Sequence, residues 1–302
     1  MIKNFQEVME IARQRGPKTI SVACAQDFEV LSAVNQAKQA GIVDAILVGD
    51  QEKIVEIANE NNIDLAQFEI IDIKDLTEAS RKAVELVSTG KAHMVMKGLV
   101  DTSVILKAVL DAEIGLRTGN VLSHVAVFDV KEYDRLFFVT DAAMNLAPDL
   151  NTKKQIIENA VQVAHALDIE EPKVAALCAV EKVNPKMKDT VDAAALEEMN
   201  KNGEITGCIV GGPFALDNAI SMEAAKHKGI THPVAGKAEI LLVPDIEAGN
   251  ILYKSMVFFA GAKNAGLIVG AKAPIVLTSR ADSDEAKLYS IALGVLCAAK
   301  LF

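Results

Sequence analysis

The chain has 302 residues, of which 51% are hydrophobic and 24% are charged, and its formal net charge is −10. A chain of this length is long for one hydrophobic core, so we expect two domains. The negative charge and the lack of tryptophan argue against a nucleic-acid-binding surface. No apolar run approaches the about 20 residues that are needed to span a bilayer.

The first residues and the cysteines predict the cellular compartment. Residues 1–16 read as an amphipathic helix with both signs of charge, and they lack the apolar block and cleavage site of a secretory signal. The four cysteines lie far apart, outside any CxxC or Cys/His pattern, which favours reduced thiols over a zinc site. We therefore expect a cytoplasmic protein without a bound metal.

The N-terminal part of the chain alternates strand and helix patterns. Short β-branched runs predict strands, and apolar residues three and four positions apart predict helices. Gly41 and Gly90 follow two of the helices as C-caps. The expected strands are 19–25, 43–48, 68–73 and 92–96, and the expected helices are 28–40, 52–60, 77–88 and 102–110. This alternation predicts βαβ units and a mostly parallel sheet.

The pattern changes after residue 118. Two strands, 121–129 and 136–140, surround the charged turn KEYDR, which predicts an antiparallel hairpin and the entry into a second domain. The elements expected after it are helices 149–167, 187–200 and 218–226, and strands 174–180, 207–211 and 239–243. The last helix, 285–301, is expected to return to the first domain. The predicted domains are therefore 1–118 with 275–302, and 119–274.

The segment PIVLTSRADSDE carries the strongest signal for function. A β-branched run that starts at Ile275 ends at Ser279 and Arg280, and acids suited to the N-cap and first turn of a helix follow. Open α/β sheets bind their ligands at such junctions. An arginine there can bind phosphate as a planar, permanently charged fork beside a serine hydroxyl. For this segment taken alone, a solvated arginine at a helix start is an equally good interpretation.

Two further junctions combine small, polar and charged residues. Lys97 leaves a buried strand, Gly98 lets the backbone come close, and Thr102 begins a helix that contains Lys107. Backbone N–H groups and a lysine at a helix N-terminus form an anion site, whereas an ordinary turn with exposed lysines is the alternative.

The second of these junctions is TDAAMNLAPD. Asp141 directly follows an apolar strand, and small residues lead from it to Asn145. This composition is typical of a shaped binding loop. The more common use of Asp and Asn in such a loop is local hydrogen bonding by their side chains.

Glycines mark the remaining two junctions. Gly211-Gly212 permits a positive φ or the close approach of a ligand, and the chain then runs through a short helix to Lys237. Asp245 precedes Gly249-Asn250, which we expect at the start of a helix opening at residue 251, as a cradle for phosphate or an oxyanion. Neither GxxxxGK[ST] nor a GxGxxG after the first strand occurs, so no conventional nucleotide site is expected.

Taken together, these loops resemble those of the phosphate acetyltransferase and phosphate butyryltransferase family. The resemblance covers nearly the whole chain and is densest in FALDNAIS, HPVAGKAEILLVPDIEAGNI and PIVLTSRADSDE, which occur in the family's order. The chain length, KGLVDTS and TDAAMNLAPD resemble the butyryl branch. The resemblance implies two α/β domains like those of isocitrate and isopropylmalate dehydrogenases, an active-site cleft between them, and a homo-oligomer built from dimers.

The family converts an acyl-CoA and phosphate into an acyl phosphate and CoA. The resemblance implies butyryl-CoA as the acyl donor, with CoA and phosphate as substrates. We expect no cofactor, because cationic side chains can balance the charge, and direct transfer in a ternary complex. A phosphate acetyltransferase, and a non-catalytic regulator that binds CoA or acyl phosphate, are the alternatives. A metal- and NAD-dependent dehydrogenase on the same architecture is a further rival, which Asp141 and Asp245 support only thinly.

The resemblance also assigns roles to single residues. Ser279 matches the motif serine that supports the tetrahedral transition state or the CoA sulfur, and Arg280 matches the arginine that binds phosphate. Lys107 falls close to a second family arginine, with a one-residue shift of the alignment. Lysine keeps the charge of that arginine and loses its bidentate geometry.

The general base is where the chain departs from the family. Acetyl enzymes place an aspartate seven residues after the motif serine, and this chain has Ala286 there. Glu285, Asp284, Asp282 or the phosphate dianion is expected to take over, and we select Glu285. The catalytic candidates are therefore Ser279, Arg280 and Glu285, and the substrate-binding candidates are Lys97, Gly98, Thr102, Lys107, Asp141, Asn145, Gly212, Lys237, Asp245, Gly249 and Asn250.

Overall fold

The computed structural model describes residues 2–278 and 282–301, and the chain divides into two compact units. The first unit comprises Phe5–Asn120 and Ala265–Phe302. The second unit comprises Met1–Asn4 and Val121–Asn264. The domain limits expected from the sequence stay a prediction, and each unit is described by itself below.

The first unit is built on a mostly parallel sheet. Its strands are, in spatial order, β3 (Glu69–Asp72), β2 (Val43–Gly49), β1 (Lys18–Ala23), β4 (Met94–Lys97), β11 (Ile275–Val276) and β10 (Lys263–Val269), which enters this unit at Ala265. Strands β10 and β11 pair antiparallel, and the pairs β3–β2, β2–β1, β1–β4 and β4–β11 are parallel. Ala23 lies opposite Lys97 and Val276 lies opposite Met96, so β1, β4 and β11 end at the same edge.

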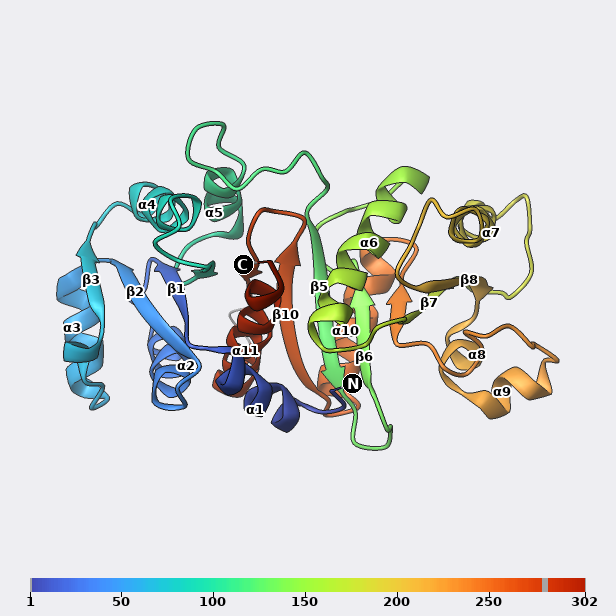
Figure 1. The fold of residues 1–302 in the computed structure, drawn as a ribbon, viewed down its shortest axis with the longest axis horizontal. Helices are drawn as coiled ribbons and strands as arrows, with labels where there is room; N and C mark the ends of the chain where they lie inside the picture. Colours follow the sequence, from blue (N-terminus) through green and yellow to red (C-terminus); the bar gives the residue numbers. More distant parts are fainter. Residues whose placement is uncertain (1, 279–281, 302) are drawn as a thin grey trace. The chain divides into compact units, whose positions relative to one another are not determined.

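Helices cover both faces of this sheet. They are α1 (Phe5–Arg15), α2 (Phe28–Gln39), α3 (Gln51–Glu60), α4 (Leu76–Ser88), α5 (Thr102–Val109) and α11 (Asp284–Leu301), with a 3₁₀ turn at Leu65–Gln67. Helix α4 packs against α5 on one face, and α11 packs against α1 and α2 on the other (Figure 1). Asp27, Asp50 and Asp75 accept hydrogen bonds from N–H groups of α2, α3 and α4, which fixes where these helices begin.

The second unit is also built around paired strands. Its strands are, in spatial order, β5 (Ser123–Asp129), β6 (Leu136–Thr140), β9 (Ile240–Leu242), β7 (Lys173–Leu177) and β8 (Ile209–Phe214). Strands β5 and β6 form the antiparallel hairpin expected around KEYDR. The pairs β6–β9, β9–β7 and β7–β8 are parallel, so these strands place their carboxyl ends at one edge.

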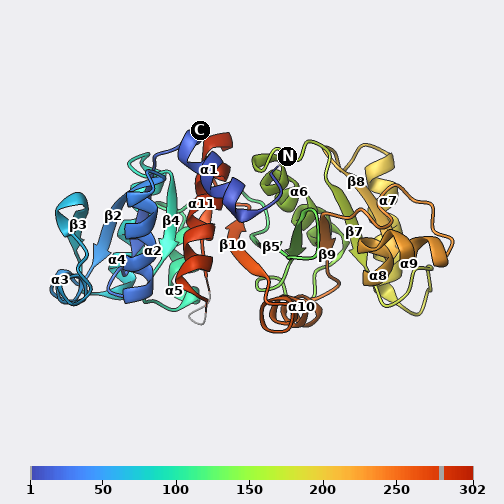
Figure 2. The ribbon, with the colours of Figure 1, turned by 90° about the horizontal axis from the view of Figure 1, so that it is seen from below.

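Five helices flank this second sheet. They are α6 (Leu150–Ala166), α7 (Lys188–Lys201), α8 (Leu216–Ile220), α9 (Met222–His227) and α10 (Ile246–Phe258). Helices α6 and α7 pack against each other, as do α8 and α9 (Figure 2). A buried cluster that includes Phe128, Phe137 and Tyr253 fills the space between the sheet and helices α8 to α10.

The expected mixed α/β fold with mostly parallel sheets is confirmed, and the deviations are local. Strand β10 was not predicted, because Asn264 and Gly266 interrupt its apolar pattern. The expected helix 218–226 is split at Ser221, whose hydroxyl caps α9. Helix α10 begins at Ile246 instead of residue 251, because Asp245 caps it.

Arg135, the residue before β6, anchors the turn that contains VAGKA. Its Nε donates to the Ala238 carbonyl (3.2 Å), and its Nη2 donates to the carbonyls of Ile220 (3.1 Å) and Gly236 (3.2 Å). The guanidinium lies over the Phe137 ring, 5.0 Å from its centroid. One side chain therefore satisfies two carbonyl groups of the VAGKA turn and the carbonyl that ends α8, at sequence separations of 85 to 103 residues.

We expect Arg135→Lys to lower the free energy of unfolding by about 1–3 kcal/mol, because a lysine cannot reach all three carbonyls and leaves polar groups unsatisfied. Urea unfolding followed by circular dichroism measures the change. Lys131→Met, at an exposed position of the same hairpin turn, serves as the control and should shift the midpoint little. An Arg135→Lys protein as stable as the parent would contradict this role.

Candidate active site

Lys97 and Gly98 lie where β4 ends, and both are closely packed. Lys97 is 7% exposed, and its Nζ donates to the carbonyls of Gly98 and Val100 (3.2 Å each). Gly98 donates its N–H to the Ala23 carbonyl (2.8 Å), and a Cβ at Gly98 would overlap the carbonyl oxygens of Ala23 and Cys24. The lack of a side chain at Gly98 therefore lets β4 pack against the end of β1 instead of leaving space for a ligand.

Thr102 and Lys107 lie at opposite ends of the short helix α5. Thr102 is its half-buried first residue, and Lys107 is exposed in its last turn. Five helical residues separate two positions by about 7.5 Å along the axis. Thr102 thus lies near Lys97 in the chain and at the same edge of the sheet, whereas the backbone of Lys107 lies away from that edge.

In the second unit, Asp141 organises the loop after β6. Its side chain is 2% exposed. Its Oδ1 accepts from the N–H groups of Ala143 (2.9 Å) and Met144 (3.0 Å). Its Oδ2 accepts from the N–H (3.1 Å) and Nδ2 (2.6 Å) of Asn145. The carboxylate and the Asn145 amide therefore shape the loop, the more common of the two roles weighed from the sequence.

The loops after β6 and β9 meet at the carboxyl edge of the second sheet. Val243 donates its N–H to the Thr140 carbonyl (2.9 Å), and Ile246 donates to the Leu146 carbonyl (3.0 Å). Asn250 Nδ2 donates to the Ala142 carbonyl (3.4 Å). The structure thus brings Asp141, Asn145, Asp245, Gly249 and Asn250 into one contiguous region.

The expected cradle at Gly249-Asn250 is wrong. Both residues lie inside α10, and the Gly249 N–H donates to the Asp245 carbonyl (3.1 Å). A Cβ at Gly249 would lie 2.7 Å from the Asp141 carbonyl oxygen. Gly249 therefore serves close packing between α10 and the Asp141 loop, and its N–H is engaged within the helix.

Gly212 and Lys237 also differ from expectation. Gly211 and Gly212 lie in β8 without a positive φ, and the Gly212 N–H donates to Glu197 Oε2 (3.0 Å). Lys237 is exposed and precedes β9, whereas Asp245 follows it. Lys237 therefore lies at the amino edge of the second sheet, opposite the region around Asp141 and Asp245.

The first turn of α11 follows Ser279 and Arg280, which lie outside the described residues. Glu285 is exposed, and its Oε1 accepts from the Tyr289 hydroxyl (2.7 Å). Asp284 Oδ2 accepts from the Ser32 hydroxyl of α2 (3.1 Å). Ala286, at the position of the family aspartate, is 4% exposed. Two of the acids expected to replace that aspartate are therefore engaged with α11 or α2.

Sequence reasoning missed two ionisable residues, Asp27 before α2 and Lys287 in the first turns of α11. Asp27 follows β1 and caps α2, with its Oδ1 accepting from the Val30 N–H (3.0 Å). Lys287 is 4% exposed, and its Nζ donates to the Asp282 carbonyl (2.6 Å). Asp27 stands at a strand-to-helix junction like the others. It escaped notice because that junction carries no glycine, hydroxyl or lysine.

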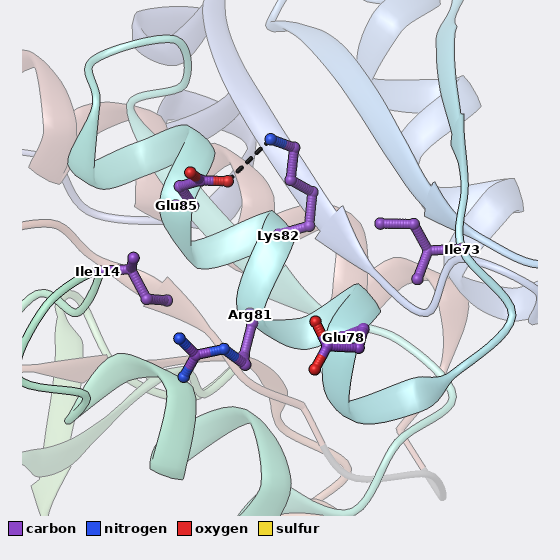
Figure 3. A pocket seen from close by; sticks show the side chains of 6 residues that line it. All are labelled: Ile73, Glu78, Arg81, Lys82, Glu85 and Ile114. Carbon is purple, nitrogen blue, oxygen red and sulfur yellow. Dashed lines mark hydrogen bonds and ion pairs between the residues drawn. The ribbon is translucent and has the colours of Figure 1, made fainter.

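A surface pocket of about 200 Å³ lies elsewhere in the first unit (Figure 3). Two of its lining cations are paired with acids, because Lys82 contacts Glu85 (2.8 Å) and Arg81 contacts Asp111 (2.5 Å). The residues that line it are Ile73, Glu78, Arg81, Lys82, Glu85 and Ile114. None of these is a candidate site residue, so the pocket does not coincide with the expected site.

The comparisons with known proteins agree with the sequence motifs. The family model described as "Phosphate acetyl/butaryl transferase" matches residues 4–79 and 74–295. The chain belongs to this family. It is 55% identical to a phosphate butyryltransferase of Clostridium acetobutylicum, over 99% of each chain. It is 47% identical to a phosphate acetyltransferase of Thermotoga maritima, over 97% of this chain and 99% of the relative.

Solved structures support the same assignment. The crystal structure of a branched-chain phosphotransacylase from Enterococcus faecalis is similar with a TM-score of 0.83 and 37% identity, covering 93% of this chain and 99% of the other. A 4-hydroxythreonine-4-phosphate dehydrogenase from Klebsiella pneumoniae is similar with a TM-score of 0.51 at 13% identity, over 94% of this chain and 100% of the other. This second likeness concerns the fold alone, and it agrees with the expected dehydrogenase-like architecture.

Two further features of the described residues bear on the class of protein. Within residues 2–278 and 282–301, no helix has both the length and the apolar character to cross a membrane. Within the same ranges, no three His, Cys, Asp or Glu side chains are grouped as ligands for a metal ion.

We expect Asp141→Asn to lower the free energy of unfolding by about 1–3 kcal/mol, because an amide NH₂ would then face the donors of Asn145. Urea unfolding measures the change. The matched control is Asp149→Asn, an exposed α6 cap whose Oδ1 accepts from the Thr152 N–H (2.8 Å). Asparagine caps helices as well as aspartate does, so the control should change little. Equal effects of the two substitutions would refute the special role of Asp141.

Proposed function

We propose that this chain is a phosphate butyryltransferase, which converts butyryl-CoA and phosphate into butyryl phosphate and CoA. The observation that carries the proposal is the full-length likeness to the clostridial phosphate butyryltransferase. The sequence motifs around Ser279, Asp141 and Asp245 also resemble those of the family. The substrates are an acyl-CoA and inorganic phosphate, and the reaction needs no cofactor.

The chemistry of this reaction requires charge stabilisation and one proton transfer. A phosphate oxygen attacks the thioester carbonyl, and negative charge develops on the carbonyl oxygen, where a donor such as the Ser279 hydroxyl stabilises it. The C–S bond then breaks, and the sulfur leaves as a thiolate that takes up a proton. Arg280 binds the phosphate as a bidentate donor. Transfer is direct, within a ternary complex.

The other candidate residues contribute to the same proposal in different ways. Lys97 and Thr102, at the carboxyl edge of the first sheet, supply charge and a hydroxyl for phosphate. Asp141 and Asn145 hold the shape of the loop after β6. Glu285 is the base selected from the sequence. Lys107 and Asp245 remain substrate-binding predictions, whereas the positions of Gly98, Gly212, Lys237, Gly249 and Asn250 do not support such a role.

A phosphate acetyltransferase is the second candidate, favoured by the likeness to the Thermotoga maritima enzyme. The two differ only in the acyl group, so rates with acetyl-, propionyl- and butyryl-CoA separate them. The cytoplasmic location and the assembly into a homo-oligomer built from dimers also remain predictions. Light scattering after size-exclusion chromatography measures the subunit number.

We expect phosphate-dependent release of CoA thiol from butyryl-CoA, in buffer with a chelator and without nicotinamide cofactor. The rate with butyryl-CoA should exceed the rate with acetyl-CoA. Thiol release that requires a metal or NAD would contradict the proposal. The complete lack of thiol release would favour a non-catalytic regulator, which equilibrium binding of CoA then tests.

We expect Arg280→Lys to lower kcat/KM for phosphate by at least about tenfold, which corresponds to about 1.4 kcal/mol. A lysine keeps the charge but loses the two parallel hydrogen bonds of the guanidinium. Steady-state kinetics with varied phosphate measures the effect. Arg13→Lys, at an exposed position of α1, is the matched control and should leave the rate unchanged. Equal kinetics of both variants would exclude Arg280 from phosphate binding.

A further inference from the structure

The structure leaves open which carboxylate handles the proton of the CoA thiol. Ala286 cannot do so, and the Glu285 and Asp284 carboxylates each hold a hydroxyl of the protein (2.7 and 3.1 Å). The question rests on the proposed function, because only an acyl transfer to or from CoA needs this proton transfer. A carboxylate supplied by an element next to α11 could take the role.

Asp27 lies at the edge of the sheet that carries the predicted phosphate-binding residues. It is the fourth residue after Ala23, the end of β1, and Ala23 lies opposite Lys97 in the neighbouring strand β4. The N–H groups of Gly98 and Leu99 donate to the carbonyls of Ala23 and Cys24 (2.8 Å each). The chain segments leaving β1 and β4 are therefore held together, with Asp27 on one and Lys97 on the other.

Helices α2 and α11 pack side by side (Figure 2). The Ser32 hydroxyl of α2 donates to Asp284, the first residue of α11 (3.1 Å). Asp27 caps the N-terminus of α2 and precedes Ser32 by five residues. The N-terminal end of α2 therefore extends about 7.5 Å from the level of this hydrogen bond to Asp27. Asp27 is half-buried at the end of that extension.

The groups that surround Asp27 shift the pKa of its carboxyl group upward. Burial raises the pKa of Asp27, and the neighbouring Glu29 on α2 raises it further. The positive charge of Lys287 on α11 and the Val30 N–H act in the opposite direction. Lys287 is fixed by its hydrogen bond to the Asp282 carbonyl (2.6 Å). A carboxylate with a raised pKa is a stronger base toward a thiol with a pKa of about 8.5.

We propose that Asp27 is the general base that accepts the proton of the CoA thiol, in place of the family aspartate that Ala286 replaces. In the direction from acyl phosphate to acyl-CoA, the S–H proton moves to the Asp27 carboxylate. The sulfur electron pair then forms the C–S bond, and the bond from the carbonyl carbon to the phosphate oxygen breaks. Phosphate leaves with that electron pair. In reverse, the protonated Asp27 returns the proton to the departing thiolate.

The deciding experiment compares Asp27→Asn and Asp27→Ser with the parent enzyme, using CoA and butyryl phosphate across pH 6 to 9. Asparagine and serine both cap helices, so α2 keeps its N-cap and folding is preserved. We expect kcat to fall by about 10²–10⁴-fold, with little change in KM for CoA. The remaining rate should rise about tenfold per pH unit up to the thiol pKa, because only preformed thiolate then reacts.

The controls are substitutions of two other acids. Glu29→Gln should retain the parent rate at pH 8 and move the acid limb of the pH–rate profile to lower pH, because the loss of its charge lowers the Asp27 pKa. Glu285→Gln tests the base selected from the sequence. Thermal melting of each variant confirms that it is folded.

The outcomes separate this inference from the proposed function. Parent-like rates and pH profiles for both Asp27 variants, in an enzyme whose parent form transfers butyryl groups, would overturn the role of Asp27 alone. A thiolate-dependent profile in Glu285→Gln but not in Asp27→Asn would assign the base to Glu285. A parent protein without any acyl transfer would overturn the proposed function and this inference together.

Discussion

The parallel alignment of β1, β4 and β11 is the constraint on which the account depends. Because Ala23 lies opposite Lys97 and Val276 lies opposite Met96, three segments distant in sequence leave the first sheet at one edge. Gly98 lets the chain after β4 approach the end of β1 closely, because a Cβ at Gly98 would overlap the carbonyl oxygens there. The backbone register therefore sets which chain segments meet at this edge, where open α/β sheets bind their ligands.

Within each unit, polar side chains act mainly by holding backbone in place. Asp141 binds four donors of its own loop, and Arg135 binds two carbonyls of the VAGKA turn and the Ile220 carbonyl at the end of α8. Lys287 similarly holds the Asp282 carbonyl. Groups that stabilise a developing negative charge work best when they are fixed before the reaction. The many motif residues engaged in internal hydrogen bonds are consistent with such preorganisation.

How far the sequence predicts this structure depends on how local the signal is. The strands of the first unit were predictable, because β-branched runs end in helix caps such as Asp50 and Asp75. Strand β10 was not, because Asn264 and Gly266 look unfavourable until their partners are known. Asn264 donates to the Tyr253 hydroxyl (2.7 Å), and Gly266 donates to the Ser290 hydroxyl (2.9 Å). Whether Lys237 and Asp27 belong to the candidate site depends on the sheet edge at which their loops lie. Sequence spacing alone does not reveal that edge.

The measurement that tests direct transfer most sharply is isotope exchange between labelled CoA and butyryl-CoA, with and without phosphate. If the acyl group passes directly between sulfur and phosphate oxygen, label enters butyryl-CoA only when phosphate is present, through butyryl phosphate as the intermediate species. Exchange at a comparable rate in phosphate-free buffer would require an acyl group held by the enzyme, and would contradict the account.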